Sequence, residues 1–520
     1  MMFAVALISR ISARKRRADE LLWRMAEIAI GKRRRSRFGL SLPLLVGVAV
    51  YAPLLFAAPA LLGDPDTYWH IATGRWIIEH GAVPDRDVFS FSMPGAPWTP
   101  PEWLAEIVIA GLYDHFGWAG LVIATAASVA AALAILLRAL LGSLAPVHAL
   151  IATVLAAMLV IPHLLARPHI LVLPILVWWV AALVAARTEN RAPSWLLVPL
   201  MTLWANMHSS YVLGLGLATL LAGEALLLAL DRQTRSQALR SWGFFTALSI
   251  AAAMVTPFGI DGLLLPFKLT TMSTLGLIKE WQSPNFDIFQ PLELWISVVL
   301  FAALWLGWRL PPTRVLILLL LLHLALKHGR YGELLGFLAP LLVAPALGSQ
   351  LAERLTHRPI SALDRGMTEL AKPASPRGIA IAGAALLAVS AVALRESAAH
   401  EASAITPKTA VAAVAAHHLQ GPVFNDYAFG GYLVFAGIEP FIDGRYFYGD
   451  AFIKRYVDAT LLLSGELPQL LAEYRITWTL FTPRNPTVVL LDHLPGWRRL
   501  YTDDIAVVHV REDQLGADDR

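Results

Sequence analysis

The chain has 520 residues, of which 57% are hydrophobic and 15% charged, against about 25% charged residues in a typical soluble domain. Long uncharged runs recur along most of the length, which excludes a soluble globular protein and predicts a polytopic α-helical membrane protein. The net charge of +4 is small, and basic residues cluster between the apolar runs, a pattern typical of membrane topology and not of nucleic-acid binding. The absence of cysteine excludes disulfides, cysteine metal sites and thiol catalysis.

Residues 1–39 are predicted to form a basic arm on the cytoplasmic side. The first ten residues, "MMFAVALISR", place apolar residues before positive charge, the reverse of a cleavable signal peptide. The arm ends in "GKRRRSRF", a cluster suited to anionic lipid.

Residues 40–394 are predicted to form the transmembrane domain, with about eleven spans. The predicted spans are 40–62, 119–142, 146–164, 168–186, 194–208, 211–230, 241–258, 287–308, 313–327, 331–348 and 378–394. With this count, four Arg-bearing segments join the basic arm on the cytoplasmic side, as the positive-inside rule requires. They are "RTENR", "DRQTRSQALR", "RLPPTR" and the long segment that begins "SQLAERLTHR".

The large first outer loop, residues 63–118, begins with "GDPDTYWHIATGRW". From Asp66, the residues Trp69, Ala72 and Trp76 share one helical face, which predicts an amphipathic helix in the membrane interface; a second such helix is predicted around Leu104. Two interpretations of Asp64 and Asp66 stay open: they stabilise the helix start, or they carry chemistry.

In residues 395–520, short apolar segments separated by polar residues and glycine replace the long apolar runs, and this region is predicted to form a small α/β domain outside the membrane. "ITWTLFTP" and "IAVVHV" are typical of strands, whereas "DAFIKRYVDATLLLSGELPQLLAEYR" is typical of helix. Four residues are candidates for acceptor binding, although turns and a local Asp–Arg pair explain them equally well. These residues are Asn425, Tyr427, Asp443 and Arg445.

The topology brings many polar residues of the spans to the outer face. Ionisable groups at such positions are costly and usually functional, although lipid contacts, helix contacts and a Lys279–Glu280 pair are open alternatives. Cations with one or two carboxylates suit a lipid-linked phosphate and a general base. Asp66 and Asp64 are the catalytic candidates, and the substrate-binding candidates are His70, Arg167, His169, Asn206, His208, Glu280, Lys327, His328 and Arg330.

The sequence resembles the GT-C superfamily of membrane glycosyltransferases, which use polyprenyl-phosphate sugars. Its members share a cytoplasmic N-terminus, one span, and an acidic residue at the start of a large outer loop with two interfacial helices. The segments "DTYWHIATGRWI", "LWANMHSSY", "IKEWQSP" and "FNDYAFGGYLV…FIDGR" carry a closer resemblance to a group of bacterial membrane proteins usually placed near GT-C. One departure is that Pro65 separates Asp64 from Asp66, whereas superfamily members often have two adjacent acids.

This resemblance implies inverting transfer of a sugar from a lipid-linked donor to a glycan, lipid or protein acceptor at the outer face of the bacterial inner membrane. A carboxylate, with Asp66 favoured over Asp64, takes the acceptor proton, and Arg and Lys stabilise the departing phosphate. A divalent cation stays an open alternative, because some superfamily branches use one. The alternatives from other classes are a transporter or flippase of lipid-linked or polysaccharide precursors and a non-catalytic scaffold of envelope assembly; a transporter is expected to show midplane polar residues and repeated halves.

Overall fold

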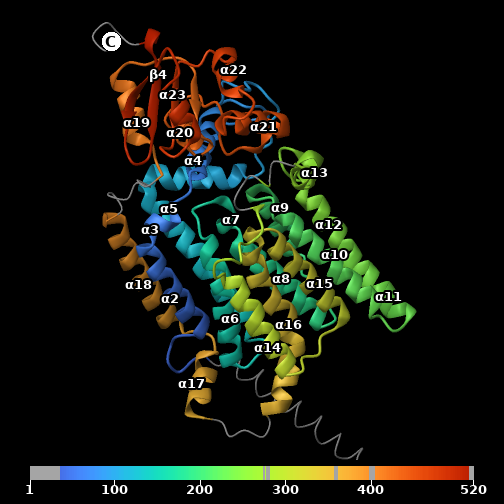
Figure 1. Cartoon of the computed structure of the whole chain (residues 1–520). Coiled ribbons are helices and arrows are strands. Elements are labelled where there is room, and N and C mark those ends of the chain that lie inside the picture. The colour runs from blue at the N-terminus through green and yellow to red at the C-terminus, as the bar shows by residue number, and fades with distance from the viewer. Residues whose placement is uncertain (1–34, 273–275, 277–280, 356–360, 397–404, 515–520) are drawn as a thin grey trace, which may run out of the picture.

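The computed structural model describes residues 35–272, 276, 281–355, 361–396 and 405–514. A bundle of helices forms one end of the molecule, and the C-terminal α/β region (residues 405–514) forms the other (Figure 1). The helix α4 and the first part of α5 lie between these two parts (Figure 1). This arrangement places the first outer loop between the helix bundle and the C-terminal elements.

The bundle consists of apolar helices, several of which begin at a proline. At the first position of a helix the fixed φ of proline is favourable, and its missing N–H would have no partner within the helix anyway. The helices that begin in this way start at Pro146, Pro168, Pro291, Pro312 and Pro376. The helices are α2 (Leu42–Phe56), α3 (Ala58–Leu61), α4 (Asp66–His80), α5 (Trp103–Leu140), α6 (Pro146–Val160), α7 (Pro168–Leu171), α8 (Leu173–Thr188), α9 (Leu197–Met207), α10 (Tyr211–Leu227), α11 (Arg232–Ala238), α12 (Phe244–Ala253), α13 (Gly259–Thr270), α14 (Pro291–Trp305), α15 (Pro312–Lys327), α16 (Gly332–Leu355), α17 (Ala362–Leu370) and α18 (Pro376–Glu396), with the short helical segments η1 (Ile161–His163), η2 (Leu239–Gly243) and η5 (Gly329–Tyr331).

Nine helices among the described residues match nine of the predicted spans. Four are long and apolar enough to cross a membrane: Trp103–Leu140, Pro146–His163, Gly329–Arg354 and Pro376–Leu394. Five shorter apolar helices are α2, α8, α9, α10 and α14. The protein is therefore a polytopic helical membrane protein, while the count of eleven spans stays a prediction.

The first outer loop contains α4 and a second helix, as predicted. The segment α5 consists of two helices joined at a kink at Gly117 (φ 58°, ψ −154°), so the first of them lies within the loop and the second is the next span. A positive φ of this kind suits glycine, so a single residue turns the helix from the interface into the bundle. The helix α4 packs closely on α5, because a Cβ at Gly74 would lie 2.1 Å from the carbonyl oxygen of Glu106.

The C-terminal α/β region has a four-stranded sheet in the order β1-β2-β4-β3. Strands β1 (Val423–Asn425) and β2 (Trp478–Phe481) are parallel, and β4 (Val507–Arg511) runs antiparallel to both β2 and β3 (Trp497–Thr502). The predicted strand segments "ITWTLFTP" and "IAVVHV" contain β2 and β4. The helices are α19 (Lys408–Ala416), α20 (Gly430–Phe435), α21 (Gly449–Thr460), α22 (Glu466–Glu473) and α23 (Pro486–Leu491), with η7 (Tyr427–Phe429), η8 (Tyr446–Tyr448) and η9 (Glu512–Gln514).

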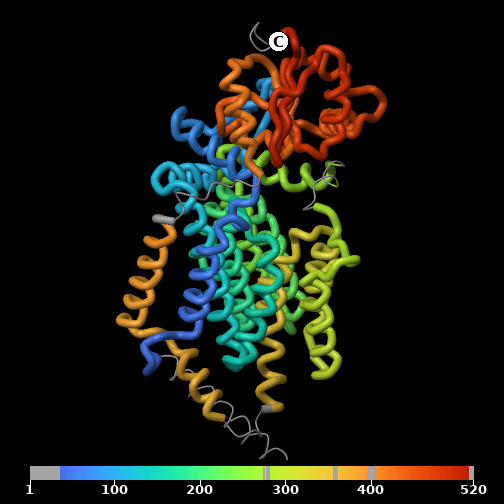
Figure 2. The backbone as a smooth tube through the Cα atoms, turned by 60° about the vertical axis from the view of Figure 1, so that its left-hand side comes forward, coloured from blue at the N-terminus to red at the C-terminus, as the bar shows by residue number. Residues whose placement is uncertain are grey.

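The C-terminal α/β region rests on α4 through α20. A Cβ at Gly431 would lie 2.5 Å from the carbonyl oxygen of Pro65, so only glycine permits this approach. Beside it, Tyr68 makes edge-to-face contacts with Tyr432 and Phe435. Figure 2 shows the blue chain of the first outer loop rising among the orange C-terminal elements.

The predicted orientation can be tested by cysteine labelling, because the chain has no cysteine of its own. Ser236→Cys in α11 and Asp504→Cys before β4 both lie at exposed positions. We expect a membrane-impermeant maleimide to label Asp504→Cys in intact spheroplasts, and Ser236→Cys only after the membrane is opened, since the Arg-bearing segment around α11 is predicted to be cytoplasmic. Labelling of Ser236→Cys in intact spheroplasts would show that the predicted topology is wrong.

Candidate active site

A cavity of about 480 Å³ lies where the bundle, the first outer loop and the C-terminal α/β region meet. This volume falls within the range of ligand pockets, about 300–1,000 Å³. The lining includes apolar side chains such as Leu173 and Leu324 together with many ionisable ones. The ionisable lining residues are Asp66, His70, Glu102, Glu106, Arg167, His169, His208, Arg330, Glu333 and Arg445.

Arg167 joins the two acids that begin the first outer loop. Its Nη2 donates to Oδ1 of Asp64 (2.6 Å) and to Oδ2 of Asp66 (2.8 Å), and its Nε lies against Oδ2 of Asp64. Asp64 is buried and also accepts the backbone N–H of Asp66 (3.0 Å), so it fixes the start of α4. Asp66 lines the cavity, whereas Asp64 does not. The geometry makes Asp66 the candidate base and Asp64 a positioning residue.

The guanidinium of Arg167 stands between Asp64 and Asp66 and offsets part of their charge, so a divalent cation bound by both acids would have to displace it. Within the described part of the chain, no group of three or more His, Asp or Glu side chains is placed to hold a metal ion.

Glu102 and Glu106, which the sequence analysis missed, face the cavity from the start of α5. Nε2 of His208 lies 3.1 Å from Oε1 of Glu102, and Nδ1 of His70 lies 3.1 Å from Oε1 of Glu106. The available signal was the spacing in "PPEWLAE", since acids four residues apart share one face of a helix.

Burial shifts the pKa values of His70 and Glu102. It lowers the pKa of His70 to about 3, with His208 adding to the effect, so His70 is a neutral imidazole. Burial also raises the pKa of Glu102 to about 8; Arg330 opposes this shift and Asp66 adds to it. At neutral pH the cavity therefore contains a protonated carboxyl group near the carboxylate of Asp66.

Arg330 is the second cation of the cavity and comes from η5, between α15 and α16. Its guanidinium lies over the ring of Trp281, 4.9 Å from the centroid, and this stacking orients it toward the space it lines. Nε2 of His169 also lines the cavity and lies 4.0 Å from Oε2 of Glu333.

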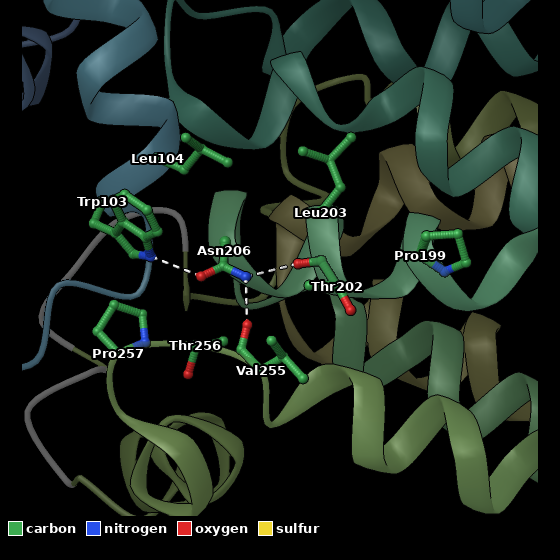
Figure 3. Close-up of a pocket in the computed structure, with 9 residues that line it drawn as sticks. All are labelled: Trp103, Leu104, Pro199, Thr202, Leu203, Asn206, Val255, Thr256 and Pro257. Carbon is green, nitrogen blue, oxygen red and sulfur yellow. Dashed lines mark hydrogen bonds between the residues drawn. The ribbon is translucent and has the colours of Figure 1, made fainter.

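The structure places three of the predicted substrate-binding residues outside this cavity. Asn206 lies in a neighbouring pocket, where it accepts a hydrogen bond from Trp103 and donates to the carbonyl oxygens of Thr202 and Val255, so its polar atoms are engaged in helix contacts (Figure 3). His328 lies against the carbonyl oxygen of Trp281, and Lys327 is exposed at the end of α15. Glu280 lies outside the described residues.

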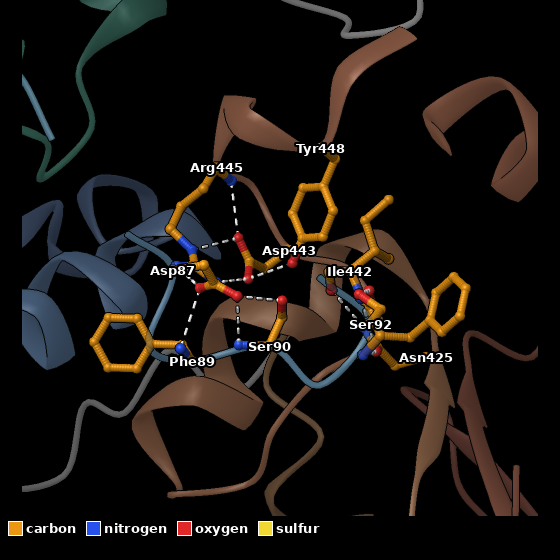
Figure 4. A network of polar contacts seen from close by, with 10 residues as sticks. Asp87, Phe89, Ser90, Ser92, Asn425, Ile442, Asp443, Arg445 and Tyr448 are labelled. Atoms are coloured by element: carbon orange, nitrogen blue, oxygen red, sulfur yellow. Dashed lines mark hydrogen bonds and ion pairs between the residues drawn. The ribbon is translucent and has the colours of Figure 1, made fainter. Parts of the chain in front are cut away.

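The candidates for acceptor binding in "FIDGR" belong to a buried network (Figure 4). Arg445 donates to Asp443 and, from Nη1, to Oδ1 of Asp87 (2.6 Å), and all three side chains are 0% exposed. Burial raises the pKa of Tyr448 well above its usual value, so its hydroxyl stays protonated and donates to Asp443 (2.9 Å). The network ties the first outer loop to the C-terminal α/β region. Arg445 borders the cavity, but its guanidinium is engaged by Asp87 and Asp443, and an acceptor could reach Asp443 only if the network opened.

Asn425 is equally committed, since its side chain bonds the backbone of Phe441 and Ile442. Tyr427 differs, because it lines the cavity. Acceptor binding by these residues stays a prediction, and the geometry favours Tyr427.

Gly444 brings the C-terminal α/β region directly against the candidate base. A Cβ at this position would lie 2.1 Å from Oδ1 of Asp66 and 3.1 Å from Nε1 of Trp69. The absence of a side chain therefore lets the "FIDGR" turn form one wall of the cavity.

The fold and this cavity define a polytopic helical membrane protein with a cavity lined by carboxyl, imidazole and guanidinium groups. Neither protein-family models nor curated protein sequences match the chain. Among solved structures, it is similar to the apo oligosaccharyltransferase of Archaeoglobus fulgidus (TM-score 0.52, 10% identity, covering 84% of this chain and 69% of that one). It is also similar to ArnT from Cupriavidus metallidurans bound to undecaprenyl phosphate (TM-score 0.45, 14% identity, covering 89% of this chain and 97% of that one). For ArnT from the same organism in the apo state, the TM-score is 0.42 and the identity 12%, covering 91% of this chain and 98% of that one. The chain therefore has the overall fold of the archaeal oligosaccharyltransferase.

Replacement of Arg445 by Met should destabilise the C-terminal α/β region. The change leaves Asp443 and Asp87 buried without their cation, which typically costs roughly 3–5 kcal/mol. We expect a lower unfolding temperature and faster proteolysis of this region in detergent, with Arg484→Met, an exposed arginine before α23, as the control. Equal unfolding temperatures for the two variants would show that the network does not hold the two parts together.

Proposed function

We propose that this protein is a membrane glycosyltransferase that transfers a sugar from a polyprenyl-phosphate donor to an acceptor on the outer face of the bacterial inner membrane. The observation that carries the proposal is the single cavity lined by Asp66, Arg167 and Arg330 in a GT-C fold. Such a transfer needs a carboxylate to accept a proton and cations to stabilise the departing phosphate, and the cavity supplies both.

In the proposed reaction, Asp66 accepts the proton of an acceptor hydroxyl. The oxygen attacks the anomeric carbon on the face opposite the phosphate, the bond from that carbon to the phosphate oxygen breaks, and the configuration inverts. The ion pair with Arg167 favours the ionised form of Asp66 and fixes its direction. Asp64 acts through Arg167 and the start of α4, because it does not line the cavity.

Arg330 is the residue we assign to the phosphate of the donor. Arg167 binds two carboxylates, and Arg330, which is stacked on Trp281, is the guanidinium that η5 contributes to the same cavity. A guanidinium suits phosphate because its planar fork of donors matches two phosphate oxygens. We derive no step through a metal ion, since the two acids at the loop start are paired with Arg167.

The acceptor, a glycan, a lipid or a protein, is proposed to enter from the side of the C-terminal α/β region. There Tyr427 and Tyr446 line the cavity, and aromatic side chains suit sugar rings. This assignment requires the N-terminus in the cytoplasm and the C-terminal α/β region outside, the orientation that the distribution of Arg predicts.

The position of the cavity favours an enzyme over a transporter. A transporter is expected to bind its substrate near the middle of the membrane, between repeated halves. Here the ionisable lining residues gather at the end of the bundle, against the C-terminal α/β region. A scaffold would not need a polar cavity at this position.

Replacement of Asp66 by Asn should lower sugar transfer by about 10²–10⁴-fold, because the variant lacks the general base. The measurement is transfer of radiolabelled sugar from a panel of polyprenyl-phosphate donors in membranes with equal amounts of each protein. Glu79→Gln, an exposed acid on the same helix, is the control and should keep wild-type activity. Wild-type activity in Asp66→Asn would refute the assignment of the base.

Replacement of Gly444 by Ala should lower transfer without unfolding the protein. The added Cβ would meet Oδ1 of Asp66 at 2.1 Å, so the carboxylate or the turn must move, and a shift of 1 Å in a reacting group can cost about 10²-fold. Gly111→Ala in α5 is the matched control, because nothing lies within 4 Å of its Cβ position. If both variants keep full activity, the "FIDGR" turn does not position Asp66.

A further inference from the structure

Glu102 is another carboxyl group that lines the cavity, and the transfer proposed above gives it no role. It lies immediately before α5, after Pro100 and Pro101, and its side chain is 18% exposed. It faces His70 of α4 on one side and His208, which follows α9, on the other. Three separate segments of the chain therefore meet at this carboxyl group.

The hydrogen bonds around His208 fix which oxygen of Glu102 is held. The indole N–H of Trp204 donates to the hydroxyl of Ser210 (3.0 Å), and the backbone N–H of Ser210 donates to Nδ1 of His208 (3.1 Å). Because Nδ1 is an acceptor, the imidazole carries its proton on Nε2 and donates it to Oε1 of Glu102 (3.1 Å). Oε2 lies 3.7 Å from His70, beyond hydrogen-bond distance, so it is the oxygen suited to carry the carboxyl proton.

Glu102 shares the cavity with the proposed base and with the proposed phosphate ligand, because Asp66, Glu102 and Arg330 all line it. Asp66 and Arg330 are both close enough to shift the pKa of Glu102, in opposite directions. A phosphate held by Arg330 would therefore occupy the same cavity as the carboxyl group of Glu102.

We propose that Glu102 is the general acid of the transfer and protonates the departing lipid phosphate. This inference rests on the proposed glycosyltransferase function. As the bond between the anomeric carbon and the phosphate oxygen breaks, that oxygen takes the electron pair of the bond and the proton from Oε2 of Glu102. The lipid phosphate leaves as a monoanion and Glu102 becomes a carboxylate.

The protons of this step balance. Asp66 gains the proton of the acceptor hydroxyl, and Glu102 loses one to the phosphate, so the enzyme resets when Asp66 releases a proton and Glu102 takes one up. Without the acid, the lipid phosphate would depart as a dianion, with a second negative charge that the cations of the cavity alone would have to stabilise. Two carboxyl groups in different protonation states give one site both an acid and a base at neutral pH.

The first test compares kcat for wild-type protein and Glu102→Gln from about two pH units below to about two above the pKa of Glu102. The groups that face Glu102 and can also titrate or shift it are Asp66, His70, Glu106, His208 and Arg330. An acid must be protonated to act, so we expect the wild-type kcat to fall as the pH rises through about 8. Glu102→Gln should lose about 10²–10⁴-fold in kcat and also lose this alkaline fall.

His208→Gln is the companion variant, because His208 is a positioning residue that acts through Glu102. It should move the midpoint of the alkaline fall without removing it, whereas Glu79→Gln should leave the whole profile unchanged. An alkaline fall that persists in Glu102→Gln would overturn the proposal.

The second test needs no turnover. The infrared difference spectrum between wild-type protein and Glu102→Gln should contain the C=O stretch of a protonated carboxyl group at neutral pH, and this band should vanish as the pH rises through about 8. A spectrum without that band would overturn the general acid even if transfer is intact. If the band is present but wild-type protein transfers sugar from no donor, the glycosyltransferase proposal fails, and the role of Glu102 fails with it for that separate reason.

Discussion

The pairing of Arg167 with Asp64 and Asp66 is the interaction on which the site depends. It joins residues 103 and 101 positions apart in the sequence and brings the start of α4 to the start of α7. Two carboxylates this close would repel each other in a site of low dielectric, and the guanidinium removes that cost with hydrogen bonds to both. Asp64 is buried and fixes the start of α4, whereas Asp66 lines the cavity.

The C-terminal α/β region completes the site instead of covering it from a distance. Gly431 and Gly444 let its backbone approach α4 more closely than any side chain would allow, and Arg445 binds Asp87 of the first outer loop in a fully buried ion pair. The cavity therefore has walls from the membrane helices, from the loop after the first span and from the C-terminal elements. A change in how the two parts dock would move the candidate base.

Asp66 and Glu102 carry the same functional group, a carboxyl group, in different surroundings. Asp66 is paired with the guanidinium of Arg167, whereas Glu102 lies beside the imidazoles of His70 and His208. A polar, charged neighbourhood favours the carboxylate, and a desolvated one favours the neutral acid. This separation would let one space handle both protons of a group transfer.

Several features of this protein could be predicted from its sequence because they depend on local pattern. Hydropathy located the apolar helices, the "GDPDTYWHIATGRW" segment indicated α4, and alternating apolar residues indicated β2 and β4. Six of the predicted site residues line one cavity, and each stands at a predicted outer end of a span or in the first outer loop: Asp66, His70, Arg167, His169, His208 and Arg330.

Only the tertiary structure decided which of these side chains meet and which polar residues serve the fold. Asn206 and Arg445 were both candidates for binding, yet Asn206 bonds neighbouring helices, and Arg445, which borders the cavity, forms ion pairs within a buried network. Glu102 and Glu106 could not be separated from ordinary interfacial acids until His70 and His208 were placed beside them. Burial and hydrogen-bond partners come from segments far apart in the chain, so the environment that makes a carboxyl group an anchor, a base or an acid exists only once those segments have packed together.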